Sequence, residues 1–178
     1  MVNQIINSFL NSNNLDLIQI NENYLNNNIG EIKTFVNNII LEHKDKYNWE
    51  LLENEYFLNP LINKFDFSYL LRDNKTNKIV FINFSSQYND LIHSHFWFCH
   101  PNYRGKNLAR IITLNLTRVA KRFNLTKINA YWPINNKGSL ILFMKLGFII
   151  NDLIKNKTQI VMESNVKNLE INIINSLK

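Results

Sequence analysis

Two histidines separated by a single residue, His93 and His95, precede a basic turn that contains glycine. Histidine titrates near neutral pH, so either ring could carry a proton from a substrate to solvent. The turn lies where an expected strand passes into an expected helix, and the N–H groups and dipole of a helix start bind anions. Arg104 and Lys106 add positive charge there. The residues alone leave two plain alternatives open, a solvated turn and two histidines without a catalytic role.

The turn itself, "RGKNLA" at 104–109, suits the close approach of a phosphate. Gly105 permits a ligand to come near the backbone, Asn107 is the residue other than glycine that best tolerates a left-handed conformation, and Ala109 is small. The turn lacks the glycine pattern of a dinucleotide fold and the G-K-[ST] of a P-loop. The functional interpretation is therefore a different phosphate-bearing cofactor.

Apolar periodicity places these residues in an α/β chain. A strong helical stripe follows the turn, and a long strand precedes it. Residues 74–77, "NKTN", suit the tight turn of a hairpin. The expected order is β-α-α-β-β-β-α-β-α-β-β, followed by a C-terminal helix. The expected strands are 15–20, 67–73, 78–86, 91–99, 127–134, 148–154 and 158–164, and the expected helices are 29–46, 49–58, 108–123, 137–146 and 166–177.

Strict alternation along 91–99 assigns the side chains of this strand to two faces. One face is expected to hold His93, His95, Trp97 and Cys99, and the other Ile92, Ser94, Phe96 and Phe98. An acceptor pocket could be lined by Trp49, Tyr56, Phe57 and Trp97, although aromatic residues at such spacings are more often plain core.

The composition indicates one ordinary domain over 1–178, with 165–178 as a helical extension, because 178 residues that are 46% hydrophobic can bury one core. Cys99 is the only cysteine, which excludes an internal disulfide, and no Cys/His cluster has zinc spacing, so no metal is expected. The N-terminal stretch lacks the features of a signal peptide, and no stretch is apolar for long enough to span a bilayer. A cytoplasmic protein without membrane contact is expected.

The formal net charge is +6 at pH 7, and the sequence pI is near 9.4. This balance favours anionic ligands. The lysines and arginines are nevertheless scattered through an asparagine-rich chain, without a dense basic run. A basic domain that binds nucleic acid is therefore only a remote alternative.

The segment "HPNYRGKNLA", followed by "NKGSLILFMKLGF" at 136–148, resembles the GCN5-related N-acetyltransferase (GNAT) family. In that family R/Q-x-x-G-x-G/A at the start of the central helix binds the pyrophosphate of acetyl-CoA. The resemblance in element order extends over 15–164 and implies a mixed, splayed central sheet flanked by helices. By position, the residues implied to contact acetyl-CoA are Arg104, Gly105, Lys106, Asn107, Leu108 and Ala109 at the pyrophosphate, the backbone of Phe98 and Cys99 along the pantetheine arm, and Asn136, Ser139 and Phe143 beside the cofactor.

This sequence departs from the family pattern at two positions that affect chemistry. Asn107 replaces the usual middle glycine of the pyrophosphate loop, which its tolerance for positive φ can accommodate. Phe143 replaces the tyrosine with which many members protonate the departing thiolate. Tyr131 could reach the sulfur instead, or it could be an ordinary core or surface tyrosine. A thiolate is also a fair leaving group without an acid, since the pKa of a thiol is near 8.5.

The His93-x-His95 pair falls where arylalkylamine N-acetyltransferases carry the His-x-His pair that removes the proton of the amine. The resemblance thus implies an N-acetyltransferase that moves the acetyl group of acetyl-CoA to a primary amine by direct attack. Cys99 could instead be a nucleophile, but a small buried strand cysteine is the commoner case. The acceptor would be a small-molecule or peptide amine, and the resemblance leaves open whether two copies form a homodimer. A non-catalytic acyl-CoA-binding or regulatory module is the alternative.

Overall fold

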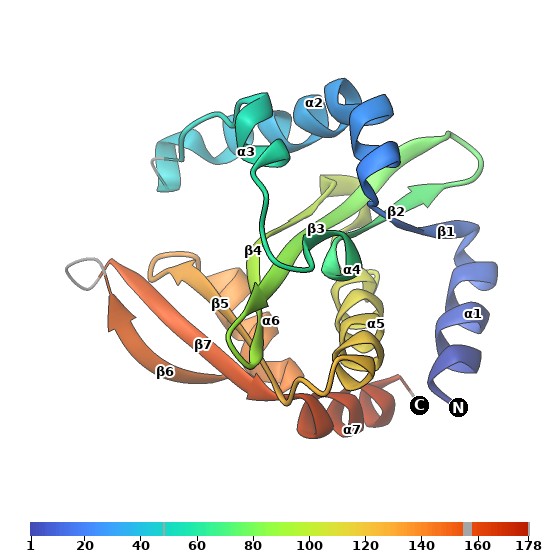
Figure 1. Cartoon of the computed structure of the whole chain (residues 1–178), viewed down its shortest axis with the longest axis vertical. Coiled ribbons are helices and arrows are strands. Elements are labelled where there is room, and N and C mark those ends of the chain that lie inside the picture. The colour runs from blue at the N-terminus through green and yellow to red at the C-terminus, as the bar shows by residue number, and fades with distance from the viewer. Residues whose placement is uncertain (48, 155–157, 178) are drawn as a thin grey trace.

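The computed structural model of the chain describes residues 1–47, 49–154 and 158–177 (Figure 1). A short 3-10 turn (Pro101–Tyr103) precedes the central helix. The other elements are α1 (Val2–Asn13), β1 (Leu15–Gln19), α2 (Glu22–Tyr47), α3 (Asn54–Leu58), α4 (Lys64–Phe67), β2 (Tyr69–Asp73), β3 (Lys78–Tyr88), β4 (Leu91–Cys99), α5 (Leu108–Arg122), β5 (Lys127–Pro133), α6 (Lys137–Leu146), β6 (Ile149–Ile154), β7 (Gln159–Asn165) and α7 (Val166–Ser176).

Within the described residues, seven strands form one mixed sheet in the order β1-β2-β3-β4-β5-β7-β6. The pair β4 and β5 is parallel, and the other neighbouring strands are antiparallel. Helices cover both faces (Figure 1). Buried side chains of α1, α5, α6 and α7 form one core with the sheet, and those of α2 and α3 form a second core on its other side. The expected mixed sheet flanked by helices is confirmed.

The central helix α5 begins at the turn singled out in the sequence. Its apolar stripe, which includes Ile111, Ile112 and Leu116, is fully buried. Asn107 precedes the helix with φ of 61°, so the left-handed conformation expected of it is present. Asn107 is exposed, whereas the apolar stripe that follows it is buried in the core. The change from polar to periodic apolar residues thus marks where the helix begins, after the end of β4.

Several predicted boundaries agree with the structure residue for residue. Strand β4 covers 91–99 and helix α6 covers 137–146, as expected. Gly147 ends α6 with φ of 105°, and a Cβ atom there would collide with the side chain of Asn172 on α7. The C-terminal helix is also confirmed, and residue 178 lies outside the described part of the chain.

The expected element order was incomplete because it contained neither α1 nor α4. Helix α1 buries Ile6 and Leu10 in the core that it shares with α5. Its asparagines and serines have weak intrinsic helix propensity, so tertiary packing decides its conformation. Helix α4 has only four residues, too few for a helical period to show.

Two other predicted helices have different starts. Helix α2 begins seven residues before 29, where the Oδ1 of Asn21 accepts a hydrogen bond from the N–H of Tyr24 at 2.8 Å. The helix expected from 49 begins only at Asn54. The side chain of Asn37 bonds both the N–H and the C=O of Leu52, at 2.9 and 3.0 Å, and this holds the preceding segment as a loop.

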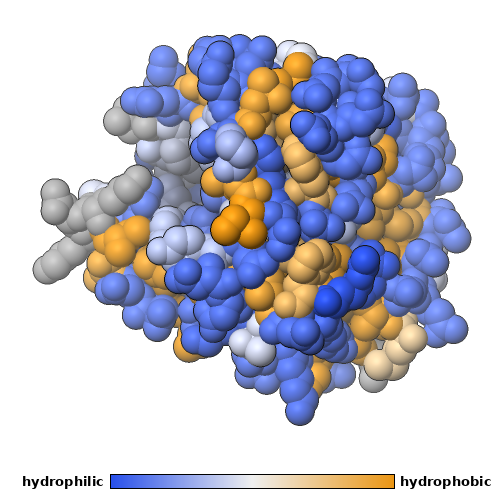
Figure 2. Space-filling model, viewed as in Figure 1, coloured by the Kyte–Doolittle hydropathy of each residue, from blue (hydrophilic) through white to orange (hydrophobic). Residues whose placement is uncertain are grey.

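The described helices include none that is long and apolar enough to cross a membrane. The face shown in Figure 2 is mainly hydrophilic, with smaller apolar areas between the polar ones. Scattered apolar side chains are normal on a protein surface and need no special explanation.

Candidate active site

The sheet opens between β4 and β5. These strands pair only from Leu91–Lys127 to Ser94–Ala130, although both continue beyond that point. A β-bulge lies where they separate: Ser94 pairs with Ser85 of β3 and Phe96 pairs with Phe84, which leaves His95 as the extra residue. A bulge bends its strand and disrupts the local ladder. The splayed sheet that the sequence resemblance implied is therefore present.

The bulge makes the predicted assignment of faces wrong for the residues that follow His95. Strict alternation placed Trp97 with His93 and separated it from Ile92. In the structure Ile92 and Trp97 belong to the same core, on the α5 side of the sheet, whereas Phe96 packs in the core under α2 and α3. One extra residue in the strand reverses the alternation after His95.

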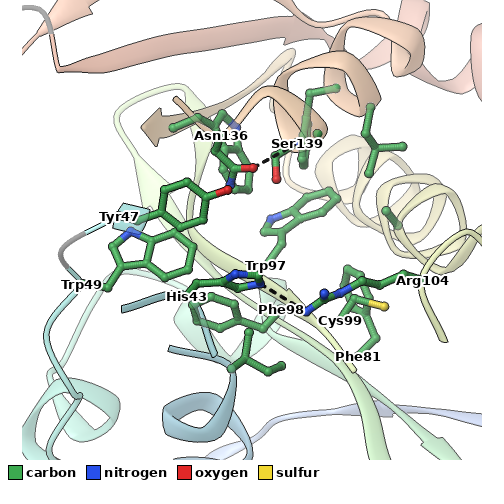
Figure 3. Close-up of a pocket in the computed structure, with 16 residues that line it drawn as sticks. His43, Tyr47, Trp49, Phe81, Trp97, Phe98, Cys99, Arg104, Asn136 and Ser139 are labelled. Atoms are coloured by element: carbon green, nitrogen blue, oxygen red, sulfur yellow. Dashed lines mark hydrogen bonds between the residues drawn. The ribbon is translucent and has the colours of Figure 1, made fainter. Parts of the chain in front are cut away.

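Two cavities meet at the opening of the sheet. The first, of about 360 Å³, lies between β4, α6 and the start of α5 (Figure 3). The second, of about 450 Å³, lies beneath α2 and α3. The residues that line both cavities are Trp49, Trp97, Phe98 and Trp132. The two cavities are therefore adjacent at this part of the sheet.

The first cavity brings together most residues expected at a cofactor. It is lined by Phe98, Cys99, Arg104, Ala109, Asn136, Ser139 and Phe143 among others. A small adjoining cavity of about 140 Å³ is lined by Gly105, Asn107 and Leu108. Lys106 lines neither, and its Nζ lies over the ring of Tyr103 at 4.6 Å from the centroid.

The basic turn has backbone geometry suited to an anion. Gly105 and Asn107 have φ of 76° and 61°. The first turn of a helix leaves its N–H groups without acceptors inside the helix, and here these groups belong to the start of α5. The hydroxyl of Tyr103 donates to Oδ2 of Asp73 at 2.5 Å, which lowers the pKa of Asp73 to about 2 and ties the turn to the end of β2. An anion would meet a turn that is already held in place.

Arg104 has partners that no motif in the sequence suggested. Its guanidinium donates to both carboxylate oxygens of Glu42 at 2.9 and 3.0 Å, and it lies 3.3 Å from Nε2 of His43. Figure 3 shows Arg104 directed toward His43 across the cavity from Asn136 and Ser139. The hydrogen bond from Arg104 lowers the pKa of Glu42. Helix α2 thereby orients the arginine at the mouth of the cavity.

The far wall of the first cavity is formed by α6. The Oδ1 of Asn136 accepts a hydrogen bond from the N–H of Ser139 at 3.3 Å and so caps this helix. Phe143 is buried, with its ring centroid 4.9 Å from Trp97 and 4.5 Å from Trp132. No hydroxyl is present at this aromatic position.

Cys99 lines the same cavity as a protonated thiol. Burial raises its pKa to about 11, and Arg104 and Lys106 only partly oppose this effect. The thiolate is the nucleophilic form of cysteine, and it is scarce at neutral pH with such a pKa. The structure thus favours the interpretation of Cys99 as a strand cysteine.

His93 and His95 both line the second cavity, with ring centroids 4.9 Å apart. The Nδ1 of His93 lies 2.7 Å from Oδ1 of Asn129 on β5, and the Nε2 of His95 lies 2.8 Å from Oγ of Ser86 on β3. The ring of Tyr131 packs against His93 at 4.6 Å between centroids. Desolvation lowers the pKa of both histidines, that of His95 to about 4. Both rings are therefore neutral bases near pH 7.

His95 should make the stability of the chain depend on pH between about 6.5 and about 4. An unfolded histidine takes up a proton near pH 6.5, whereas the folded His95 does so only near pH 4. The unfolded state binds more protons in this window, so the free energy of unfolding falls as the pH falls. Urea unfolding across the window should show a smaller loss for His95→Gln than for the wild type, and equal losses would contradict the assignment.

The aromatic lining of the second cavity differs from the expected set at one position. Trp49, Tyr56 and Trp97 line it, and Trp97 reaches the first cavity too. Phe57 does not, because it is fully buried in the core under α2.

The described residues contain no group of three or more His, Cys, Asp or Glu that could hold a metal ion.

The sequence matches one known protein family. Residues 34–148 match the model of the acetyltransferase (GNAT) family. No curated protein matches the sequence significantly.

Solved structures share the fold at low sequence identity. Naa50 of Arabidopsis thaliana, in complex with the bisubstrate analogue CoA-Ac-MVNAL, has a TM-score of 0.65 and 15% identity, and the match covers 85% of this chain and 98% of that chain. The PaiA N-acetyltransferase of Thermoplasma acidophilum, in complex with coenzyme A, has a TM-score of 0.66 and 12% identity over 85% and 98%. The ribosomal-protein-S18-alanine N-acetyltransferase of Escherichia coli has a TM-score of 0.60 and 12% identity over 85% and 94%.

Proposed function

The chain belongs to the acetyltransferase (GNAT) family, and we propose that it transfers the acetyl group of acetyl-CoA to a primary amine by direct attack. One observation carries this proposal. A cavity lined by Arg104 and Ala109, at the turn before α5, shares four lining residues with a second cavity, which is lined by two neutral histidines. A phosphate-bearing acyl donor on one side and an amine on the other would meet at the opening.

The donor side would hold acetyl-CoA by its pyrophosphate and its pantetheine arm. The N–H groups at the start of α5, with Arg104, would bind the pyrophosphate. Beyond Ser94 strand β4 has left β5, so the backbone of Phe98 and Cys99 can pair with the pantetheine amides as with an added strand. The Arabidopsis and Thermoplasma structures, with a CoA analogue and coenzyme A bound, support this ligand class.

The acceptor side would remove the proton that prevents attack. An amine is protonated at neutral pH and cannot attack a thioester until it loses a proton. His93 and His95 are neutral near pH 7 and lie together at the opening, which supports their role as proton acceptors. The resemblance of the sequence to arylalkylamine N-acetyltransferases at His93-x-His95 is a further reason for proposing this role. The Arabidopsis analogue, which carries a peptide, supports including peptide N-termini among the candidate acceptors.

The thiolate would leave without a tyrosine in the position of Phe143. Replacing Phe143 with Tyr should preserve the fold and raise kcat by up to about 10-fold, since a hydroxyl at this position can protonate the sulfur but thiolate already leaves readily. The measurement is thiol release at fixed pH. Phe148→Tyr is the matched control, because it adds a hydroxyl to the same aromatic cluster outside the first cavity. A folded Phe143→Tyr variant with unchanged kcat would show that another group or water already protonates the thiolate.

Thiol release from acetyl-CoA tests the proposal directly. The purified chain would be assayed with arylalkylamines, polyamines, aminoglycosides, amino acids and peptides with free N-termini. At least one class should give turnover that depends on the amine concentration, with acetylated amine as the product. Tight binding of CoA without turnover on any of these would instead identify a non-catalytic acyl-CoA-binding module.

A further inference from the structure

Asn129 is a buried polar residue at the opening of the sheet, and no feature of the sequence drew attention to it. It lies on β5 directly opposite His93 in the parallel pair, and only 8% of its surface is exposed. Its Oδ1 is 2.7 Å from Nδ1 of His93. The contact thus joins the two strands one residue pair before the last pair of their ladder, Ser94 and Ala130.

The chemistry of the amide oxygen determines where the histidine carries its proton. A carbonyl oxygen only accepts hydrogen bonds, so Nδ1 of His93 must be the donor. A neutral imidazole protonated at Nδ1 has its lone pair at Nε2. Within the described residues Nε2 of His93 has no hydrogen-bond partner, and His93 is among the residues that line the second cavity. That nitrogen is therefore available to a ligand.

His95 is held differently. Its Nε2 contacts the hydroxyl of Ser86, which can either donate or accept, so this contact does not select a tautomer. Several described groups that carry charge or titrate lie near the pair. They are Tyr131 on β5, Lys64 on α4, Glu163, which pairs with Asn129 in the sheet, its ion-pair partner Lys127, and Glu50 and Tyr56, which line the second cavity. Only His93 combines a fixed tautomer with a free nitrogen at the cavity.

We infer that Asn129 is a positioning residue that holds His93 protonated at Nδ1. Nε2 of His93 is then the atom that takes the proton from the ammonium group of the amine substrate. The inference rests on the proposed function. The ammonium gives one proton to Nε2, and the amine lone pair then forms the C–N bond to the thioester carbon. The C–S bond breaks, and the thiolate takes the second proton of the attacking nitrogen. The imidazolium releases its proton to solvent, which balances the reaction.

NMR of the imidazole nitrogens tests the tautomer without any need for activity. In isotope-labelled wild-type protein above the pKa of the ring, His93, assigned by its absence in His93→Gln, should be protonated at Nδ1. Asn129→Leu should lose this preference while the signals of His95 keep their pattern. Protonation at Nε2 of His93 in the wild type would overturn the inference.

Kinetics then test the consequence. Asn129→Leu should lower kcat/KM for the amine by roughly 10- to 100-fold, because the amide orients the base. The Kd of CoA should stay unchanged, since Asn129 lines neither the first cavity nor the cavity at the turn of α5. Asn129→Asp keeps an acceptor at Nδ1 and should recover the tautomer. Its negative charge should also move the acidic limb of the kcat/KM profile to higher pH, because it favours the imidazolium.

The two proposals fail in different ways. A chain that neither binds CoA nor turns over contradicts the proposed function, whatever the tautomer of His93. A chain that turns over, but whose Asn129→Leu variant keeps the wild-type kcat/KM and tautomer, contradicts only the role of Asn129.

Discussion

Replacing Gly105 with glutamate is expected to weaken the binding of CoA by roughly 100-fold or more. Gly105 has φ of 76°, and a residue other than glycine in this left-handed region costs about 1–3 kcal/mol of conformational free energy. The carboxylate would also place negative charge beside the pyrophosphate, and about 1.4 kcal/mol corresponds to each tenfold in Kd. Titration calorimetry with CoA measures the change.

Two comparisons separate this effect from a general loss of structure. Gly30→Glu adds the same charge on the exposed surface of α2, where a Cβ would have no neighbour within 4 Å, and it should bind CoA like the wild type. Pantetheine lacks the pyrophosphate, so its affinity should hardly change in Gly105→Glu. Arg104→Ala, which leaves the backbone intact, should weaken CoA by about 10-fold. Wild-type affinity in a folded Gly105→Glu protein would remove the turn as the phosphate site.

The elements that form the cofactor side could be predicted because their signals are local. The buried stripe of α5 repeats at helical spacing, and Gly147 marks the end of α6 in the sequence itself. The turn between β4 and α5 could be predicted because Gly105 and Asn107 lie between a segment with strand periodicity and one with helical periodicity. Neither its anchor on Asp73 nor the contact of Arg104 with Glu42 has a local signal, because each partner is distant in the chain.

In this chain, which has four glycines, asparagine occupies many of the positive-φ positions that glycine usually takes. Among the described residues, those other than glycine with positive φ are all asparagine: Asn14, Asn63, Asn77, Asn89, Asn107 and Asn124. Asparagine tolerates this region better than other side chains do. Asn107, which replaces the family glycine, is therefore one of several asparagines with positive φ in the described residues. The replacement leaves the backbone conformation of the turn intact.

The acceptor side could be predicted only in part. His93 and His95 were identified from their types and spacing, and the structure places both at the second cavity. The bulge at His95 has no sequence signal, since a strand with one extra residue has the same composition as a regular one. Asn129 was missed because its role depends on the parallel pairing of two strands joined through α5. The extent of one domain over 1–178 stays a prediction.

Replacing both His93 and His95 with glutamine is expected to lower kcat/KM for the acceptor amine by roughly 10²- to 10⁴-fold, the range for a positioned general base. The Kd of CoA should stay near the wild-type value, because neither histidine lines the first cavity or the turn of α5. His95→Gln alone should lose less than the double variant, since the Nε2 of His93 remains available at the second cavity.

The pH profile distinguishes a base from a structural histidine. In the wild type the acidic limb of kcat/KM should lie below histidine's ordinary pKa of about 6.5, because burial lowers the pKa of both rings and a protonated ring cannot accept a proton. In the double variant this limb should move up toward the pKa of the free amine, since only amine that is already neutral can then attack. A folded double variant that binds CoA and keeps the rate and profile of the wild type would contradict proton transfer at this pair. The base would then have to be another group of the second cavity, where Glu50 is the carboxylate among the lining residues.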